Sequence, residues 1–213
     1  MAVLETPPLK QTARRRVMQE RAPMQETATR SAGPRPYQFT VADYYRMAET
    51  GILKDDDRVE LIEGEIVMMP PIDFIHSQGT HESQKKLFQL ALGTYDVRCQ
   101  HPVRLSATNE PVPDIAVVKP IRLTGHPGPD ETFIILEVAN TSLEEDLGRK
   151  RLMYAAAAIP EYWVLDVVGC QLHQFTKPRE GDYHEHRILA ADEEVRSVIL
   201  PQVVAQVAEL LPS

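Results

Sequence analysis

Cysteine and long apolar runs are both scarce in this chain. The two cysteines, Cys99 and Cys170, have no CxxC or other ligand-like spacing, which argues against a disulfide framework and a zinc cage. No stretch approaches the roughly eighteen apolar residues of a membrane-spanning helix. The N-terminus also lacks the apolar core that a secretory signal peptide needs. We therefore expect a cytoplasmic protein that does not enter a membrane.

Basic residues are in short supply over most of the chain. Residues 1–36 carry seven Lys and Arg and three Glu, whereas the remainder carries 16 basic and 28 acidic residues. A body with this negative charge does not bind nucleic acid through phosphate contacts alone. The first 36 residues lack periodicity and predict a disordered basic tail, which is either solvated or contacts phosphates. Residues 37–213 contain no second linker and are predicted to form one domain.

The hydrophobic pattern of this domain predicts helices and strands in mixed order. Thr40 can cap a helix over 41–50, and Glu63-Gly64 suits a tight turn between two short strands. A longer helix follows over about 73–92. Further extended runs are predicted at 96–100, 103–107, 114–118 and 133–139, then a helix over 143–158, a strand at 161–167 and a hairpin over 171–177 and 183–189. This order predicts an α/β fold with a mixed β-sheet flanked by helices.

Two of these strands each place one carboxylate in an otherwise apolar row. Asp114 begins DIAVV (114–118), and Glu137 lies on one face of FIILEVA (133–139), because alternate side chains of a strand share a face. An unpaired buried carboxylate is destabilising, so each needs a cation or hydrogen bonds. One divalent cation neutralises both if the strands are neighbours, and oxygen ligands suit Mg²⁺ or Mn²⁺. Alternatively, Asp114 caps a turn and Glu137 pairs with an arginine.

Lys150 interrupts the apolar seam of the helix predicted over 143–158. At about 100° per residue it shares a stripe with Leu147 and Tyr154, whereas its basic neighbours lie off that stripe. Asp146 lies one turn earlier, so an i,i+4 ion pair on a solvated face is the alternative. Combined with two acids, an inward lysine is what a metal-dependent phosphodiesterase needs to orient a water and offset phosphorane charge.

Two acids on adjacent strands plus a lysine form the pattern of the PD-(D/E)XK nuclease superfamily. The chain resembles one of its branches, the Uma-type restriction endonuclease family, over roughly residues 37–170. The motifs that carry the resemblance are VELIEGEIVMMPP (59–71), Pro113-Asp114, Glu137-Val138 and DLGRKRLMYAAAAIPEYWVLD (146–166). The resemblance implies a restriction-endonuclease-like core.

The resemblance also implies the roles of the site residues. The nuclease lysine usually lies two residues after the second acid, where this chain has Ala139, so Lys150 matches the family lysine instead. The implied metal ligands are Asp114, Glu137 and Glu60.

Glu60 and His76 each keep a second interpretation. Glu60 is either part of the metal shell or a cross-strand partner within its hairpin. His76 is either a site residue or a packing residue. It begins a strip of small residues, with Gly79, Thr80 and Ser83, that leaves room for a ligand.

These inferences together predict an Mg²⁺- or Mn²⁺-dependent endonuclease that hydrolyses phosphodiester bonds, with nucleic acid, DNA foremost, as the partner. One alternative is a catalytically silent nuclease-fold module that binds DNA or mediates assembly. Another is a hydrolase that uses the same metal on a phosphorylated small molecule. A homodimer is compatible with Leu152, which faces away from the seam, although a single exposed leucine is common.

Overall fold

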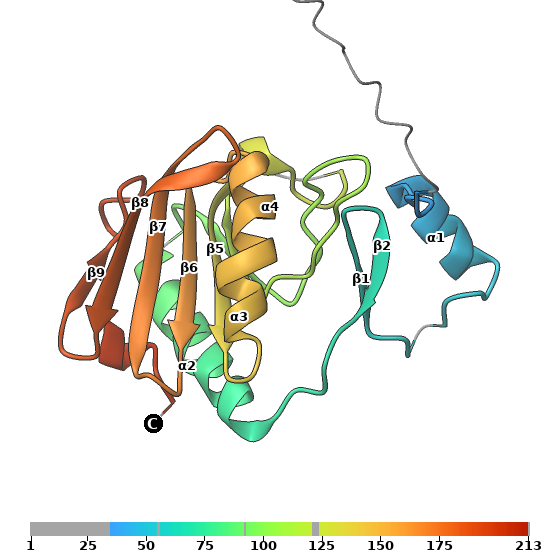
Figure 1. Cartoon of the computed structure of the whole chain (residues 1–213). Coiled ribbons are helices and arrows are strands. Elements are labelled where there is room, and N and C mark those ends of the chain that lie inside the picture. The colour runs from blue at the N-terminus through green and yellow to red at the C-terminus, as the bar shows by residue number, and fades with distance from the viewer. Residues whose placement is uncertain (1–34, 55, 92, 121–123, 213) are drawn as a thin grey trace, which may run out of the picture. The chain divides into compact units, whose positions relative to one another are not determined.

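A six-stranded β-sheet organises the computed structural model of this chain (Figure 1). The structure describes residues 35–54, 56–91, 93–120 and 124–212. The tail predicted over 1–36 therefore lies outside the described residues, except for its last two positions. Within the described ranges, no helix is both long enough and apolar enough to cross a membrane.

The sheet is mixed, as predicted. Its order is β3 (Asp96–Cys99), β4 (Ile115–Val118), β5 (Thr132–Ala139), β6 (Glu161–Asp166), β7 (Gln171–Arg179) and β8 (Asp182–Ala190). Strands β5 and β6 run parallel, and their other neighbours in this sheet are antiparallel. A parallel pair needs a crossover connection, which the helical segment after β5 supplies.

Helices cover both faces of this sheet (Figure 1). Helix α2 (Phe74–Ala91) packs on one face through Leu87 and Ala91. The other face is covered by one continuous helical segment. It comprises α3 (Leu143–Glu145), the π-helical turn η2 (Asp146–Lys150) and α4 (Arg151–Ala156). The predicted arrangement of helices on both sides of a mixed sheet is confirmed.

Local sequence signals account for the N-terminal elements. The Thr40 hydroxyl accepts a hydrogen bond from the Asp43 amide, and the Asp43 carboxylate accepts one from the Thr40 amide, so a capping box begins α1 (Val41–Glu49). Positive φ angles at Glu63 and Gly64, 51° and 76°, form the tight turn of a hairpin. That hairpin pairs β1 (Val59–Ile62) with β2 (Glu65–Met68).

The predicted strand at 103–107 does not form. Val103 and Leu105 are buried, but their backbone amides donate to Pro111 and Asn109 rather than to a neighbouring strand. The apolar alternation that suggested a strand thus packs as a loop. This loop precedes β4. The short helix η1 (Pro129–Glu131) lies between β4 and β5.

The C-terminal segment packs on the α2 side of the sheet and adds β9 (Glu194–Arg196), β10 (Val204–Gln206) and η3 (Val207–Glu209). It closes over the strip of small residues on α2, because the Ser83 hydroxyl donates to the Leu210 carbonyl. A Cβ added at Gly79 would lie 2.9 Å from Val138 Cγ1 and 3.2 Å from Val167 Cγ1. The expectation that this strip leaves room for a ligand is therefore wrong, since protein atoms fill it.

Candidate active site

Asp114 and Glu137 lie opposite each other where β4 begins and β5 ends. In the antiparallel register Ile115 pairs with Leu136, so the next position outward sets the two acids face to face. The Asp114 amide donates to Glu137 Oε2 at 3.1 Å. The Val138 amide donates to Asp114 Oδ2 at 2.8 Å. Each carboxylate thus receives a backbone hydrogen bond from the other strand, which fixes their mutual position.

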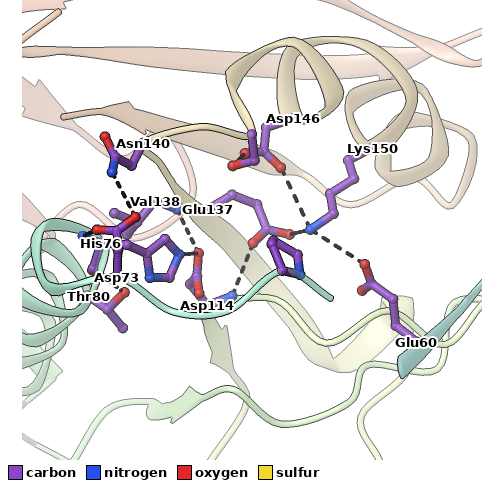
Figure 2. A network of polar contacts seen from close by, with 12 residues as sticks. Glu60, Asp73, His76, Thr80, Asp114, Glu137, Val138, Asn140, Asp146 and Lys150 are labelled. Atoms are coloured by element: carbon purple, nitrogen blue, oxygen red, sulfur yellow. Dashed lines mark hydrogen bonds and ion pairs between the residues drawn. The ribbon is translucent and has the colours of Figure 1, made fainter. Parts of the chain in front are cut away.

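Lys150 enters the same place from η2 (Figure 2). Its Nζ lies 3.1 Å from Glu137 Oε1, 3.7 Å from Asp146 Oδ1 and 3.9 Å from Glu60 Oε1. The lysine side chain is 13% exposed and that of Asp146 only 2%. The alternative of an Asp146–Lys150 pair on a solvated face is therefore wrong. The ammonium instead lies among three buried carboxylates.

Glu60 and His76 approach this cluster from two further elements. Glu60, on β1, is buried and its Oε2 accepts from the Val112 amide at 3.0 Å, so it is turned toward the cluster rather than toward its hairpin partner. His76, in the first turn of α2, places Nε2 3.0 Å from Asp114 Oδ2. Asp73 caps this helix by accepting from the His76 amide at 2.9 Å.

A single cavity of about 80 Å³ contains all five residues that the sequence predicts for the site. Five different elements or strand ends position them: β1, the first turn of α2, the start of β4, the end of β5 and η2. Residues 69–72 form an apolar wall on the hairpin side. Because a water needs about 10–15 Å³ of such space, the cavity has room for an ion and several waters.

The cavity holds more acidic groups than cations. Burial raises the pKa of Glu137 to about 8; Lys150 opposes this rise, and Asp114 adds to it. Burial likewise raises the pKa of Asp146. Burial alone would lower the pKa of Lys150, but the neighbouring carboxylates, Glu137 foremost, raise it above its ordinary value. The hydrogen bond to Asp114 raises the pKa of His76. Additional positive charge would therefore stabilise this site.

Sequence reasoning missed two residues of the cluster, Asp146 and Tyr154. The Tyr154 hydroxyl, fully buried on α4, donates to Glu137 Oε1 at 2.9 Å. Both residues lie four positions from Lys150, on the helix face that it occupies. That i,i+4 spacing is the sequence signal that could have identified them, although an apolar seam and a surface ion pair give the same spacing.

The donor set fits a hard divalent cation. No three of the described His, Cys, Asp and Glu side chains already form a ligand group. Ligand capacity nevertheless remains, because Asp114 Oδ1 makes no hydrogen bond to a described residue and Glu137 Oε2 accepts only one. Each carboxylate oxygen can accept two. Carboxylate oxygens in an acidic, partly enclosed cavity suit Mg²⁺ or Mn²⁺ better than zinc.

Comparison with known proteins identifies the family. The Uma2 family, described as "Putative restriction endonuclease", matches residues 41–208. The chain belongs to the Uma2 family. A search of curated proteins gives no match. Among solved structures, this Uma2 chain is similar to a putative nuclease belonging to DUF820 from Anabaena variabilis. The two share 14% identity with a TM-score of 0.64, over 81% of this chain and 97% of the other. That likeness shows a shared restriction-endonuclease-like fold.

In this Uma2 family member, the cation of the cluster comes from a helix rather than from the strand of the second acid. Ala139, two residues after Glu137, is fully buried in the apolar cluster beneath α4. Position 139 therefore brings no charge to the site. Lys150 reaches Glu137 Oε1 from the helical segment that follows β5, at the position that the sequence resemblance implies.

Proposed function

We propose that this protein is a metal-dependent endonuclease that hydrolyses phosphodiester bonds of nucleic acid, with DNA as its main substrate. The observation that supports the proposal most directly is the convergence of Asp114, Glu137 and Lys150 in one small cavity. Burying two acids and a lysine together costs free energy, and such clusters of perturbed groups are typical of functional sites. Membership of a family described as restriction endonucleases supports the same reaction class.

Asp114 and Glu137 would hold Mg²⁺ or Mn²⁺, with Glu60 as a further ligand. The acidic excess of the cavity and the spare lone pairs on Asp114 and Glu137 support this assignment. When bound, such a cation stabilises negative charge on a phosphate and lowers the pKa of a water. The Asp114 and Glu137 carboxylates are already oriented by backbone amides, so little reorganisation is needed to accept it.

The other residues would act on the water and the phosphate or orient the ligands. Lys150 would position the attacking water and offset the charge that develops on the phosphate oxygens. Tyr154 holds Glu137 through its hydroxyl. His76 contacts Asp114 and would keep that carboxylate aligned with the metal. Each of these side chains is placed by a helix packed on the sheet, so the proposed machinery stands on rigid elements.

The test uses the full chain with supercoiled plasmid in Mg²⁺, in Mn²⁺ and in excess chelator. We expect cleavage with either metal and none with chelator. Asp114→Ala should lower the rate by more than about 100-fold. Mutation of residues that only hydrogen-bond to metal ligands typically costs about 10- to 100-fold, and loss of a ligand itself should cost more. Asp192→Ala, a change of the same kind at an exposed turn residue, is the matched control.

Two outcomes would count against the proposal. Unchanged cleavage by a folded Asp114→Ala protein would exclude the metal role of that carboxylate. Absence of cleavage by the wild type in both metals, combined with retained DNA binding, would favour the catalytically silent module.

A further inference from the structure

Asp146 carries a polar atom that its surroundings do not satisfy. The residue is 1% exposed, and its Oδ2 accepts from the Ser142 hydroxyl at 2.6 Å. Its Oδ1 is buried, makes no hydrogen bond to any described residue and lies 3.7 Å from Lys150 Nζ. A buried carboxylate oxygen left without a partner costs free energy. Asp146 lines the cavity, and the ammonium of Lys150 is the cation that lies near this oxygen.

The backbone around Asp146 is also unusual. The π-helical turn begins at Asp146 and ends at Lys150, between two α-helical pieces. Such turns are rare, appear mostly as single turns within α-helices and are frequent at functional sites. The Tyr162 hydroxyl donates to the Asp146 carbonyl at 3.0 Å, which anchors the turn to β6. Glu145, one residue earlier, is exposed, whereas Asp146 lines the cavity.

The present partner of Lys150 is the carboxylate that the proposed metal would use. Lys150 donates to Glu137 Oε1 at 3.1 Å. A divalent cation held by Glu137 would repel the ammonium at such short range, so the lysine would move toward another carboxylate. Glu60 is within reach but is itself a proposed ligand, and one of its oxygens is held by a backbone amide. Asp146 Oδ1 is nearer and makes no hydrogen bond among described residues.

We propose that Asp146 is a positioning residue that receives the Lys150 ammonium when Glu137 engages a divalent cation. This inference rests on the proposed function, from which it takes the metal and the reaction. It adds the residue that keeps Lys150 in the cavity. Without Asp146, Lys150 would leave the cavity once the metal is bound. The exchange is a movement of one flexible side chain between two carboxylates on either side of it, and it leaves the backbone of η2 in place.

The test compares Asp146→Asn with Glu145→Gln, which removes the same charge from the adjacent exposed residue. Each full-length protein is treated with acetic anhydride in the presence and absence of Mn²⁺. Acetylation of Lys150 is quantified by mass spectrometry, with exposed Lys177 as the internal standard. Without Mn²⁺, we expect Lys150 to be protected in all three proteins by Glu137. With Mn²⁺, its acetylation should rise in Asp146→Asn and stay low in the wild type and the control.

Mn²⁺ titration calorimetry and kinetics complete the test. Mn²⁺ affinity should fall far less in Asp146→Asn than in Asp114→Ala, because only a nearby charge and no ligand is lost, whereas kcat for plasmid cleavage should fall about 10- to 100-fold with little change in KM. Ser142→Ala, which removes only the hydrogen bond to Oδ2, should give the same changes at smaller size and covers the case in which Asp146→Asn does not fold. Loss of Mn²⁺ affinity as large as that in Asp114→Ala would make Asp146 a metal ligand and overturn the inference. Equal acetylation in wild type and Asp146→Asn with Mn²⁺ would overturn it as well.

The two proposals fail in different ways. A wild type that binds Mn²⁺ but does not cleave plasmid would contradict the nuclease function while the acetylation result still decides the role of Asp146. A wild type that does not bind Mn²⁺ would overturn both, because the inference requires a cation on Glu137.

Discussion

Two buried glutamates on neighbouring strands have opposite surroundings. Glu161, at the start of β6, is fully buried and makes no ion pair with a described residue. It accepts five hydrogen bonds from neutral groups: the Ser197 hydroxyl, the Val198 and Ile199 amides, the Trp163 indole and the Gln174 side-chain amide. Glu137, on β5, receives the Lys150 ammonium and faces further acids.

The difference separates a structural carboxylate from a candidate functional one. The donors to Glu161 occupy both of its oxygens and tie the loop after β9 to the sheet. The neighbours of Glu137 include the Lys150 ammonium and groups of like charge, so another cation could take over the compensation of its charge. A buried acid can therefore be classed by whether its partners are fixed and neutral or exchangeable and charged.

Cleavage should separate the two glutamates most strongly. Glu137→Gln should reduce plasmid cleavage by more than about 100-fold, because the amide is a far weaker ligand for a divalent cation. Glu161→Gln, the matched change on the next strand, should leave the rate per folded molecule unchanged. Circular dichroism establishes the folded fraction of each protein. Equal losses in both variants would erase the proposed distinction.

The free energy of unfolding should depend more on Glu161 than on Glu137. Glu161→Ala leaves several buried donors without an acceptor and should lower the free energy of unfolding by about 3 kcal/mol. Urea denaturation at pH 7 measures this change. The remaining folded protein should still cleave at the wild-type rate. A variant with wild-type stability would show that water replaces the lost carboxylate.

The pH dependence of stability should sharpen the comparison in metal-free protein. Burial raises the pKa of Glu137 from 4.5 to about 8, so the folded state holds a proton that the unfolded state releases between these values. The free energy of unfolding should therefore fall as the pH rises from 4.5 to 8, by up to about 5 kcal/mol. Glu137→Gln should remove this fall, and Glu161→Gln should retain it. Denaturation curves in excess chelator across this range check both expectations.

The parts of the fold set by local signals were predictable from the sequence. The cap at Thr40, the turn at Glu63-Gly64 and the alternation in β5 each depend on a few adjacent residues, and the structure has all three elements. The inward phase of Lys150 was also predictable, because helical periodicity alone selects it over the basic residues on either side. The apolar alternation of 103–107 was misleading because a loop can bury the same side chains as a strand.

The remaining features depend on tertiary packing. The burial of Asp146 depends on how the helical segment packs on the sheet, because its i,i+4 spacing from Lys150 equally fits a surface ion pair. The strip of small residues on α2 suggested a ligand, but the C-terminal segment that fills it lies far along the chain. Whether an acid is buried among donors or among other acids, as at Glu161 and Glu137, is decided by segments that come together only in the folded protein.

The tight packing at Gly79 means that the α2 side of the sheet helps to orient the Asp114 carboxylate. Val138 touches the glycine through its side chain and holds the Asp114 carboxylate through its amide. A methyl group at position 79 would push against the Val138 side chain and displace the Val138 amide, although it would not contact the cavity itself. A shift in the packing of α2 would therefore change the orientation of the Asp114 carboxylate, although every proposed catalytic residue would still be present.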